Sequence, residues 1–231
     1  RVSAKVQLQD NENTGIQIYT DDENATALQD VTVSISNLDL ADIISVMPYM
    51  PDIKGVANGD YHIILNKEDM SISANMDIHQ FMYEGYNLGN LSTEIVYMPQ
   101  NDGSHHIDGM LYKDDAEVAT VQGTYYFLNG GDRIDAEIDM KEMPLNLVNG
   151  FIPDQIIGLE GVAVGHLTIQ GELDRPDVNG TADLSRALLV SVPYGVKLKM
   201  DSTPVTIEKS HVKFENFRFF DSRDQALTVN G

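Results

Sequence analysis

Apolar and polar residues alternate along most of the chain, which is the pattern of a β-strand with one face in water. Segments 31–35, 70–78, 196–201 and 212–215 all show it, with an apolar side chain at every second position and Ser, Thr, Asn, Asp, Lys or Glu between. The pattern predicts an all-β chain with a curled antiparallel or mixed sheet that is apolar on one face only.

Turn-forming residues interrupt the alternation at Asn101–Gly103, Asn129–Asp132 and Asn179–Gly180, where each segment contains residues that tolerate positive φ. Two other segments lack the alternation. Apolar residues follow helical spacing in 39–47, and a second apolar segment, 144–152, lies beside prolines. We expect a short helix in each of these segments.

The two expected helices precede similar sequences. Gly55–Ile63 reads GVANGDYHI and Gly161–Ile169 reads GVAVGHLTI, so five of nine positions are identical, and the two stretches start 106 residues apart. The similarity predicts an internal repeat of a strand-rich unit, with approximate units 1–139 and 140–231 in one elongated β-rich chain.

Composition and charge limit the classes of molecule that the chain can bind. With 231 residues and 42% hydrophobic content, the chain is long enough to bury a core. Its 36 acidic and 15 basic residues give a formal net charge of -21, which excludes nucleic acid as a partner and opposes electrostatic docking on anionic lipid headgroups. A lipid contact would therefore be apolar.

The chain contains no cysteine, which excludes disulfides, thiolate nucleophiles and sulfur-ligated zinc. No apolar run approaches the roughly 18–20 residues that span a bilayer. The sequence begins within an alternating segment, and we therefore expect it to be part of a longer protein.

Glycine, proline and apolar residues recur in a characteristic order in the second half of the chain. The stretches that carry this order are Leu159–Gly161, Gly165–Leu173, Pro176–Gly180, Leu188–Val190, Tyr194–Leu198 and, further upstream, Tyr83–Leu91 and Gly123–Tyr125. In this respect the chain resembles the AsmA-like family of bacterial envelope proteins, and in particular its TamB-type domains. The resemblance covers about residues 39–231.

The resemblance implies a periplasmic location, as part of a protein anchored in the inner membrane. It implies a β-taco fold, in which repeated strands extend a groove with an apolar concave face. It also implies a role in phospholipid traffic and outer-membrane biogenesis without enzymatic activity. The implied partners are lipid acyl chains and an outer-membrane barrel protein, with no cofactor.

A sheet with one apolar face must cover that face, because each large aliphatic side chain left in water forgoes roughly 1.5–3 kcal/mol. A second sheet would provide this cover, and periodicity alone leaves a sandwich or barrel open. Together with the resemblance, however, the pattern favours a groove filled by acyl chains. The candidate groove residues are Ile72, Met76, Ile138, Leu167, Ile169, Leu189, Val196, Leu198, Ile207, Val212 and Phe214.

Catalytic and metal chemistry has little support in the sequence. The adjacent His105 and His106 would point to opposite faces of a strand, which does not suit a metal pair. Asp135, Glu137 and Asp139 lie in one row on a predicted strand, whereas a glycosidase needs two carboxylates that face each other across a cleft. Two alternatives stay open: a chaperone or scaffold that pairs with strands of outer-membrane proteins, and a carbohydrate-active β-structure.

Overall fold

A computed structural model describes residues 3–6, 14–20, 28–44, 52–67, 69–83, 85–127, 131–151, 157–191 and 193–231. The chain is all-β, and every strand pair of known register is antiparallel. It divides into two compact units, residues 1–116 and 117–231, which we describe separately. In the described residues, no helix is long and apolar enough to cross a membrane.

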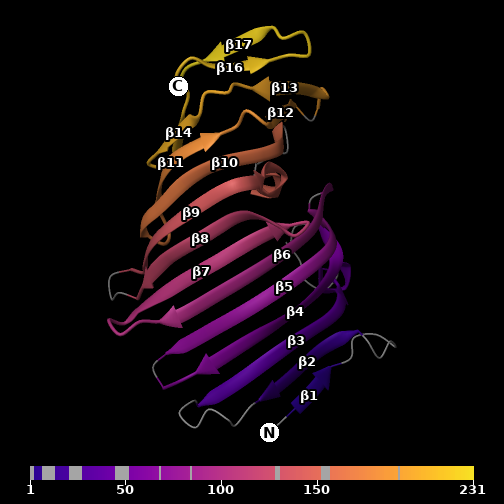
Figure 1. The fold of residues 1–231 in the computed structure, drawn as a ribbon, viewed down its shortest axis with the longest axis vertical. Helices are drawn as coiled ribbons and strands as arrows, with labels where there is room; N and C mark the ends of the chain where they lie inside the picture. Colours follow the sequence, from indigo (N-terminus) through magenta and orange to yellow (C-terminus); the bar gives the residue numbers. More distant parts are fainter. Residues whose placement is uncertain are drawn as a thin grey trace. The chain divides into compact units, whose positions relative to one another are not determined.

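The N-terminal unit is a meander in which each strand pairs with the next along the chain (Figure 1). Its elements are β1 (Ser3–Val6), β2 (Gly15–Thr20), β3 (Gln29–Asp39), α1 (Leu40–Ile44), β4 (Ile53–Leu65), β5 (Met70–Tyr83), β6 (Tyr86–Pro99) and β7 (Ser104–Lys113). The alternating segments 31–35 and 70–78 lie within β3 and β5, as predicted.

Irregular pairing is concentrated at one end of this meander. The register shifts between Ile35 and Leu38 in β3, and again near Lys54 in β4 and near Ile78 in β5. Such bulges bend a strand and increase its twist, and they therefore curl the sheet. The buried apolar residues of the unit gather at this end: Leu38, Leu40, Ala57, Phe81, Leu88 and Leu91.

The C-terminal unit contains β8 (Ala116–Tyr126), β9 (Arg133–Pro144), η1 (Leu145–Phe151), β10 (Ile157–Glu172), β11 (Asp177–Asp183), β12 (Ala187–Ser191), β13 (Val196–Met200), β14 (Val205–Glu208), β15 (His211–Lys213), β16 (Phe217–Phe220) and β17 (Ala226–Val229). The long strand β10 divides the sheet. Its first residues pair with β12, and the residues from Val164 onward pair with β11.

Two ladders continue from this division. One runs through β11, β14 and β15, and the other through β12, β13, β16 and β17. Side chains of both ladders share one core, which contains Val205 from the first and Phe217 and Phe219 from the second. Both ladders thus contribute side chains to one packed core, a feature that the sequence did not predict.

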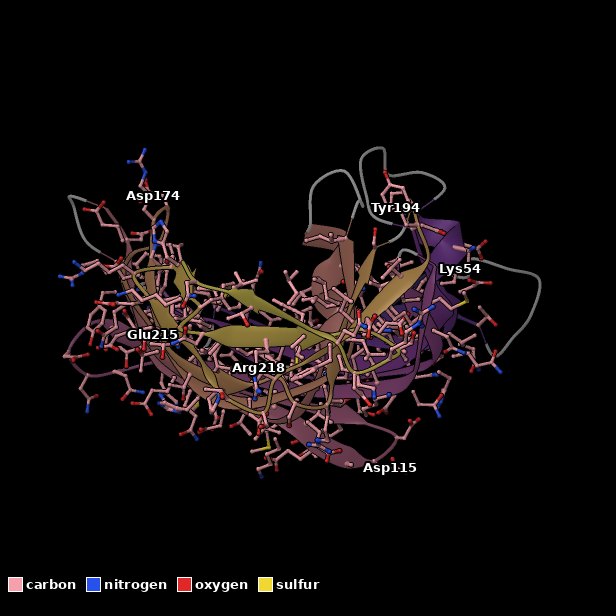
Figure 2. The ribbon with its side chains drawn as sticks, turned by 90° about the horizontal axis from the view of Figure 1, so that it is seen from above. Lys54, Asp115, Asp174, Tyr194, Glu215 and Arg218 are labelled. Atoms are coloured by element: carbon pink, nitrogen blue, oxygen red, sulfur yellow. The ribbon has the colours of Figure 1, made fainter. Side chains whose placement is uncertain are left out.

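The C-terminal sheet is curved. Figure 2 shows the turn at Asp174, between β10 and β11, at one raised end of this unit and the turn at Tyr194, between β12 and β13, at the other. The predicted curled antiparallel sheet is confirmed within each unit.

Both expected helices are present but short. α1 covers part of 39–47, and residues 45–47 lie outside the described residues. The segment 144–152 forms the 3-10 helix η1, and Ile152 lies outside the described residues. The buried Asn149 joins η1 to β10, since its amide donates to the Leu159 carbonyl (2.8 Å) and accepts from the Leu159 N–H (2.7 Å).

The similar stretches Gly55–Ile63 and Gly161–Ile169 share two local features in β4 and β10. Gly55 and Gly161 both have positive φ (139° and 90°), and Ala57 and Ala163 are both buried. The repeat units 1–139 and 140–231 stay a prediction, because the compact units meet at a different point, between Ala116 and Glu117.

One turn prediction was wrong. Asn179–Gly180 lies inside β11, not between strands. The glycine is required by close approach, because a Cβ on Gly180 would lie 2.1 Å from the His166 carbonyl oxygen of the neighbouring β10. The predicted turn at Asn101–Gly103 is confirmed between β6 and β7, whereas Asn129 and Gly130 lie outside the described residues.

The buried Asp201 gives the C-terminal unit a pH dependence. Arg218 donates from Nε to Asp201 Oδ2 (2.8 Å), and this hydrogen bond lowers the pKa of the Asp201 carboxyl. Because the folded-state pKa is depressed, the pair stabilises the fold above the unfolded pKa of about 3.9, and this contribution disappears as the pH falls through the folded-state pKa.

We therefore expect the unfolding midpoint of Asp201→Asn to be lower than wild type at neutral pH and to change less between about pH 5 and pH 2. Urea unfolding followed by circular dichroism at several pH values measures both effects. Parallel pH profiles for the two proteins would contradict the assignment.

Candidate functional site

Apolar side chains of the N-terminal unit form continuous rows that cross the strands at right angles. The register places Ile18, Val33, Tyr61, Ala74, Ile95 and Gly109 directly opposite one another in a row from β2 to β7. With strands about 4.8 Å apart, five spacings make this central row about 24 Å long. The predicted groove residues Ile72 and Met76 lie in the two rows that flank it.

On β5, the apolar face is the less exposed of the two faces. On β5, Ile72, Ala74 and Met76 are half-buried, whereas the alternate residues Ser73 and Asn75 are exposed. In a single-layered sheet such a difference arises when curvature crowds the side chains of one face. The face is still open, since Ile18 and Ile95 keep 38% and 45% of their surface exposed.

The pKa of Tyr61 indicates how well its phenol group on this face is solvated. Its ring belongs to the central row, and burial raises the pKa of the Tyr61 phenol above its ordinary value. The direction indicates that the ionised phenolate is poorly solvated there.

The C-terminal unit has a comparable row. Val121, Ile138, Leu167, Gly180, Ile207 and Val212 are successive register partners across β8, β9, β10, β11, β14 and β15. We call them the C-terminal row. Four of the predicted groove residues belong to it, and a fifth, Ile169, lies on the same face two residues from Leu167 along β10. Val212 is 48% exposed, and the other members are half-buried.

Of the other predicted groove residues, Leu189, Val196 and Leu198 lie on the second ladder, and Phe214 follows β15 of the first. Leu189 and Leu198 are register partners, and together with Phe214 they pack against the core that contains Phe217 and Phe219. Val196 is 47% exposed near the turn at Tyr194. The structure thus places Leu189, Leu198 and Phe214 beside a packed core, while the C-terminal row stays open.

The opposite face of the sheet is polar and acidic. On β9, Asp135, Glu137 and Asp139 are all exposed on this face. Asp139 pairs with His166 (2.8 Å), and Gln170 donates to Asp135 (3.1 Å). These contacts join neighbouring strands on the face opposite the C-terminal row.

The two adjacent histidines lie at the start of β7. His105 is buried and stacks on Tyr97, with ring centroids 4.7 Å apart, while His106 is half-buried. Within the described ranges, no three His, Asp or Glu side chains converge closely enough to hold a metal ion.

Sequence reasoning missed several members of the apolar rows. Val33, Tyr61 and Ala74 occupy the centre of the N-terminal face, and Val121 and Gly180 belong to the C-terminal row. The alternation gave their face, but their alignment depends on strand register.

Comparisons with family models, curated proteins and solved structures give no match for this chain.

Proposed function

We propose that the chain is a non-enzymatic part of a bacterial envelope protein that conducts phospholipid passively along its apolar rows. The observation that carries the proposal is the alignment of half-exposed aliphatic side chains into rows that cross successive strands, on the apolar face of each sheet. Such a row presents a continuous apolar surface that runs across the sheet, from one strand to the next.

The energetics favour an acyl chain as the occupant. Burying one methylene group is worth about 0.8 kcal/mol, so moving a 16-carbon tail through water costs on the order of 12 kcal/mol. A continuous apolar face removes most of this barrier without a chemical step. The acidic outer face keeps a protein with this much accessible apolar surface soluble.

The family resemblance supports the same function and adds a location. As an AsmA-like, TamB-type domain, the chain would lie in the periplasm, as part of a protein anchored in the inner membrane, and would move phospholipid between the two membranes. No cofactor is required, since the groove itself provides the binding energy.

Matched substitutions on the two faces test this proposal. Leu167→Asp places a charge in the C-terminal row, and Thr168→Asp places the same charge on the opposite face of β10. Ile72→Asp and Ser73→Asp form the corresponding pair on β5 of the N-terminal unit. The probe is a phospholipid with a photoreactive group in its acyl chain, presented in vesicles, and crosslinked protein is measured by intact mass.

We expect each apolar-face variant to lose crosslinking by about tenfold or more, because an unpaired carboxylate against an acyl chain costs several kcal/mol and each 1.4 kcal/mol is a factor of ten. Thr168→Asp and Ser73→Asp should crosslink like wild type. Circular dichroism confirms that every variant is folded. Equal crosslinking within each pair would refute the lipid path.

A second candidate function is strand pairing with outer-membrane proteins. It is favoured by the edge strand β17, which, among strands of the described residues, pairs with β16 alone and exposes Ala226, Leu227 and Thr228. An unpaired edge of this kind can accept a further strand. Crosslinks from Thr228 to nascent barrel strands, with no lipid bound to the apolar face, would favour this function over lipid conduction.

A further inference from the structure

A pocket of about 340 Å³ lies at the strand ends of the C-terminal unit, and we call it the strand-end pocket. Its lining residues are Tyr126, Arg133, Ile134, Asp135, Gln170 and Gly171. They come from the end of β8, the start of β9 and the end of β10. Figure 2 shows Asp174, in the turn that follows β10, at a raised end of the curved sheet.

Two opposite charges line the pocket without joining each other. Arg133 and Asp135 are two residues apart on β9, so their side chains point to the same face with their Cα atoms about 7 Å apart. Among the described residues, Arg133 forms no ion pair, whereas Arg186 and Arg218 do. Asp135 is held in place by Gln170, which donates from Nε2 to Asp135 Oδ1 (3.1 Å).

The charged residues around the pocket restrict the charge that a bound ligand can carry. A simple anion would contact Arg133, but it would be repelled by Asp135, by Glu172 directly opposite Arg133 in the register, and by the net charge of -21. A simple cation would be repelled by Arg133. A zwitterion satisfies both groups, because its anionic end meets the guanidinium and its ammonium meets the carboxylates.

The aromatic wall of the pocket suits the same ligand. Tyr126 is the register partner of Arg133 and is 37% exposed. A tyrosine ring face attracts ammonium groups.

We propose that the strand-end pocket binds a zwitterionic phosphoammonium group of the phosphoethanolamine type, with Arg133 on the phosphate and Asp135 on the ammonium. Arg133 and Asp135 lie on the polar face of β9, so the acyl chains of a phospholipid held there would pass around the strand ends to reach the opposite, apolar face with Ile134, Ala136 and Ile138. This role as a headgroup site rests on the proposed lipid conduction.

Titration of the complete chain with soluble headgroups tests the pocket without any acyl chain. The probes are glycerophosphoethanolamine, glycerophosphate as the anion alone, and ethanolamine as the cation alone. We expect saturable binding of the zwitterion by NMR or calorimetry, with the two single charges weaker by about tenfold or more, since each of them lacks one of the two charge-assisted contacts.

Matched variants locate the binding. Arg133→Gln and Asp135→Asn should each weaken binding of glycerophosphoethanolamine by about tenfold. Arg175→Gln, at an exposed arginine of the β10–β11 turn, and Glu137→Gln, at the next outward residue on β9, change the same charges outside the pocket and should bind like wild type. No saturable binding, or equal binding by all four variants, would overturn the proposal.

A second experiment, with lipid vesicles, distinguishes failure of the pocket proposal from failure of the lipid-conduction proposal. Vesicles of phosphatidylethanolamine and phosphatidylglycerol are offered together, and we expect wild type to take up more of the zwitterionic lipid and Asp135→Asn to lose this preference. A chain that takes up both lipids equally and binds no soluble headgroup refutes the pocket alone. A chain that binds glycerophosphoethanolamine but takes up no lipid keeps the pocket and refutes lipid conduction.

Discussion

Phe217→Ala is expected to lower the free energy of unfolding of the C-terminal unit by about 3–5 kcal/mol, the range for removal of a fully buried aromatic ring. Phe217 is only 2% exposed, and its ring centroid lies 5.3 Å from that of Phe214 and 5.2 Å from that of Phe219. The substitution would leave a cavity between the two ladders that β10 separates. Urea unfolding followed by far-UV circular dichroism measures the change.

The matched control for this prediction is Leu227→Ala. Leu227 lies opposite Phe219 on the neighbouring strand β17 but is 60% exposed. Because surface substitutions usually change stability by about 0.5 kcal/mol or less, its midpoint should stay close to wild type. Equal midpoints for Phe217→Ala and Leu227→Ala would show that the ladders do not share a packed core.

Gly180→Ala is expected to lower the free energy of unfolding by about 2–6 kcal/mol, which combines backbone strain of about 1–3 kcal/mol with a similar cost for overpacking. The backbone of Gly180 has a φ of 145°, and the added Cβ would meet the His166 carbonyl oxygen at 2.1 Å. To relieve this contact, β11 must move away from β10 at the centre of the C-terminal row.

Gly103→Ala is the control, because Gly103 also has positive φ (83°) but lies in a true turn where an added Cβ meets nothing within 4 Å. Only the strain of the left-handed conformation remains there, about 1–2 kcal/mol. Urea unfolding of both variants measures the difference. If Gly180→Ala were no more destabilising than Gly103→Ala, the close pairing of β10 and β11 would be wrong.

The sequence predicted the strands well because their pattern is local. Alternation in 31–35 and 70–78 requires only that neighbouring residues point to opposite faces, and both segments form strands of the N-terminal unit. The apolar segments 39–47 and 144–152 likewise identified α1 and η1, although each helix is shorter than its segment.

The wrong prediction of a turn at Asn179–Gly180 follows from the two structural uses of glycine. In sequence, Asn179–Gly180 is a strong turn signal, because both residues tolerate positive φ. The same glycine also permits close approach of two backbones inside a sheet, and only the position of His166 on β10 decides between these uses. A local reading cannot include that neighbour.

The division of the C-terminal sheet was also beyond a local reading. β10 is one continuous strand, and its two halves pair with different partners, β12 and β11. This pairing places Leu189 and Leu198 beside the packed core rather than on the open face, and Phe214, which follows β15, packs against the same core. Their alternation is the same as that of Ile138 and Leu167, which belong to the C-terminal row.

Prediction of the candidate site from local sequence patterns had the same limit. Alternation gave the correct face for Ile72, Met76, Ile138 and Leu167, since each of these residues points to the apolar face of its sheet. It did not give the rows, because a row depends on register between strands that lie far apart in the chain. Tyr61 was missed for this reason, although it occupies the middle of the N-terminal face.

Native mass spectrometry of the complete chain after incubation with phospholipid vesicles tests the central claim most directly. If open apolar rows hold acyl chains, the folded protein should carry bound phospholipid, and Leu167→Asp should carry less than Thr168→Asp. A folded chain that shows only its own mass after this treatment, with no difference between the two variants, would contradict lipid conduction.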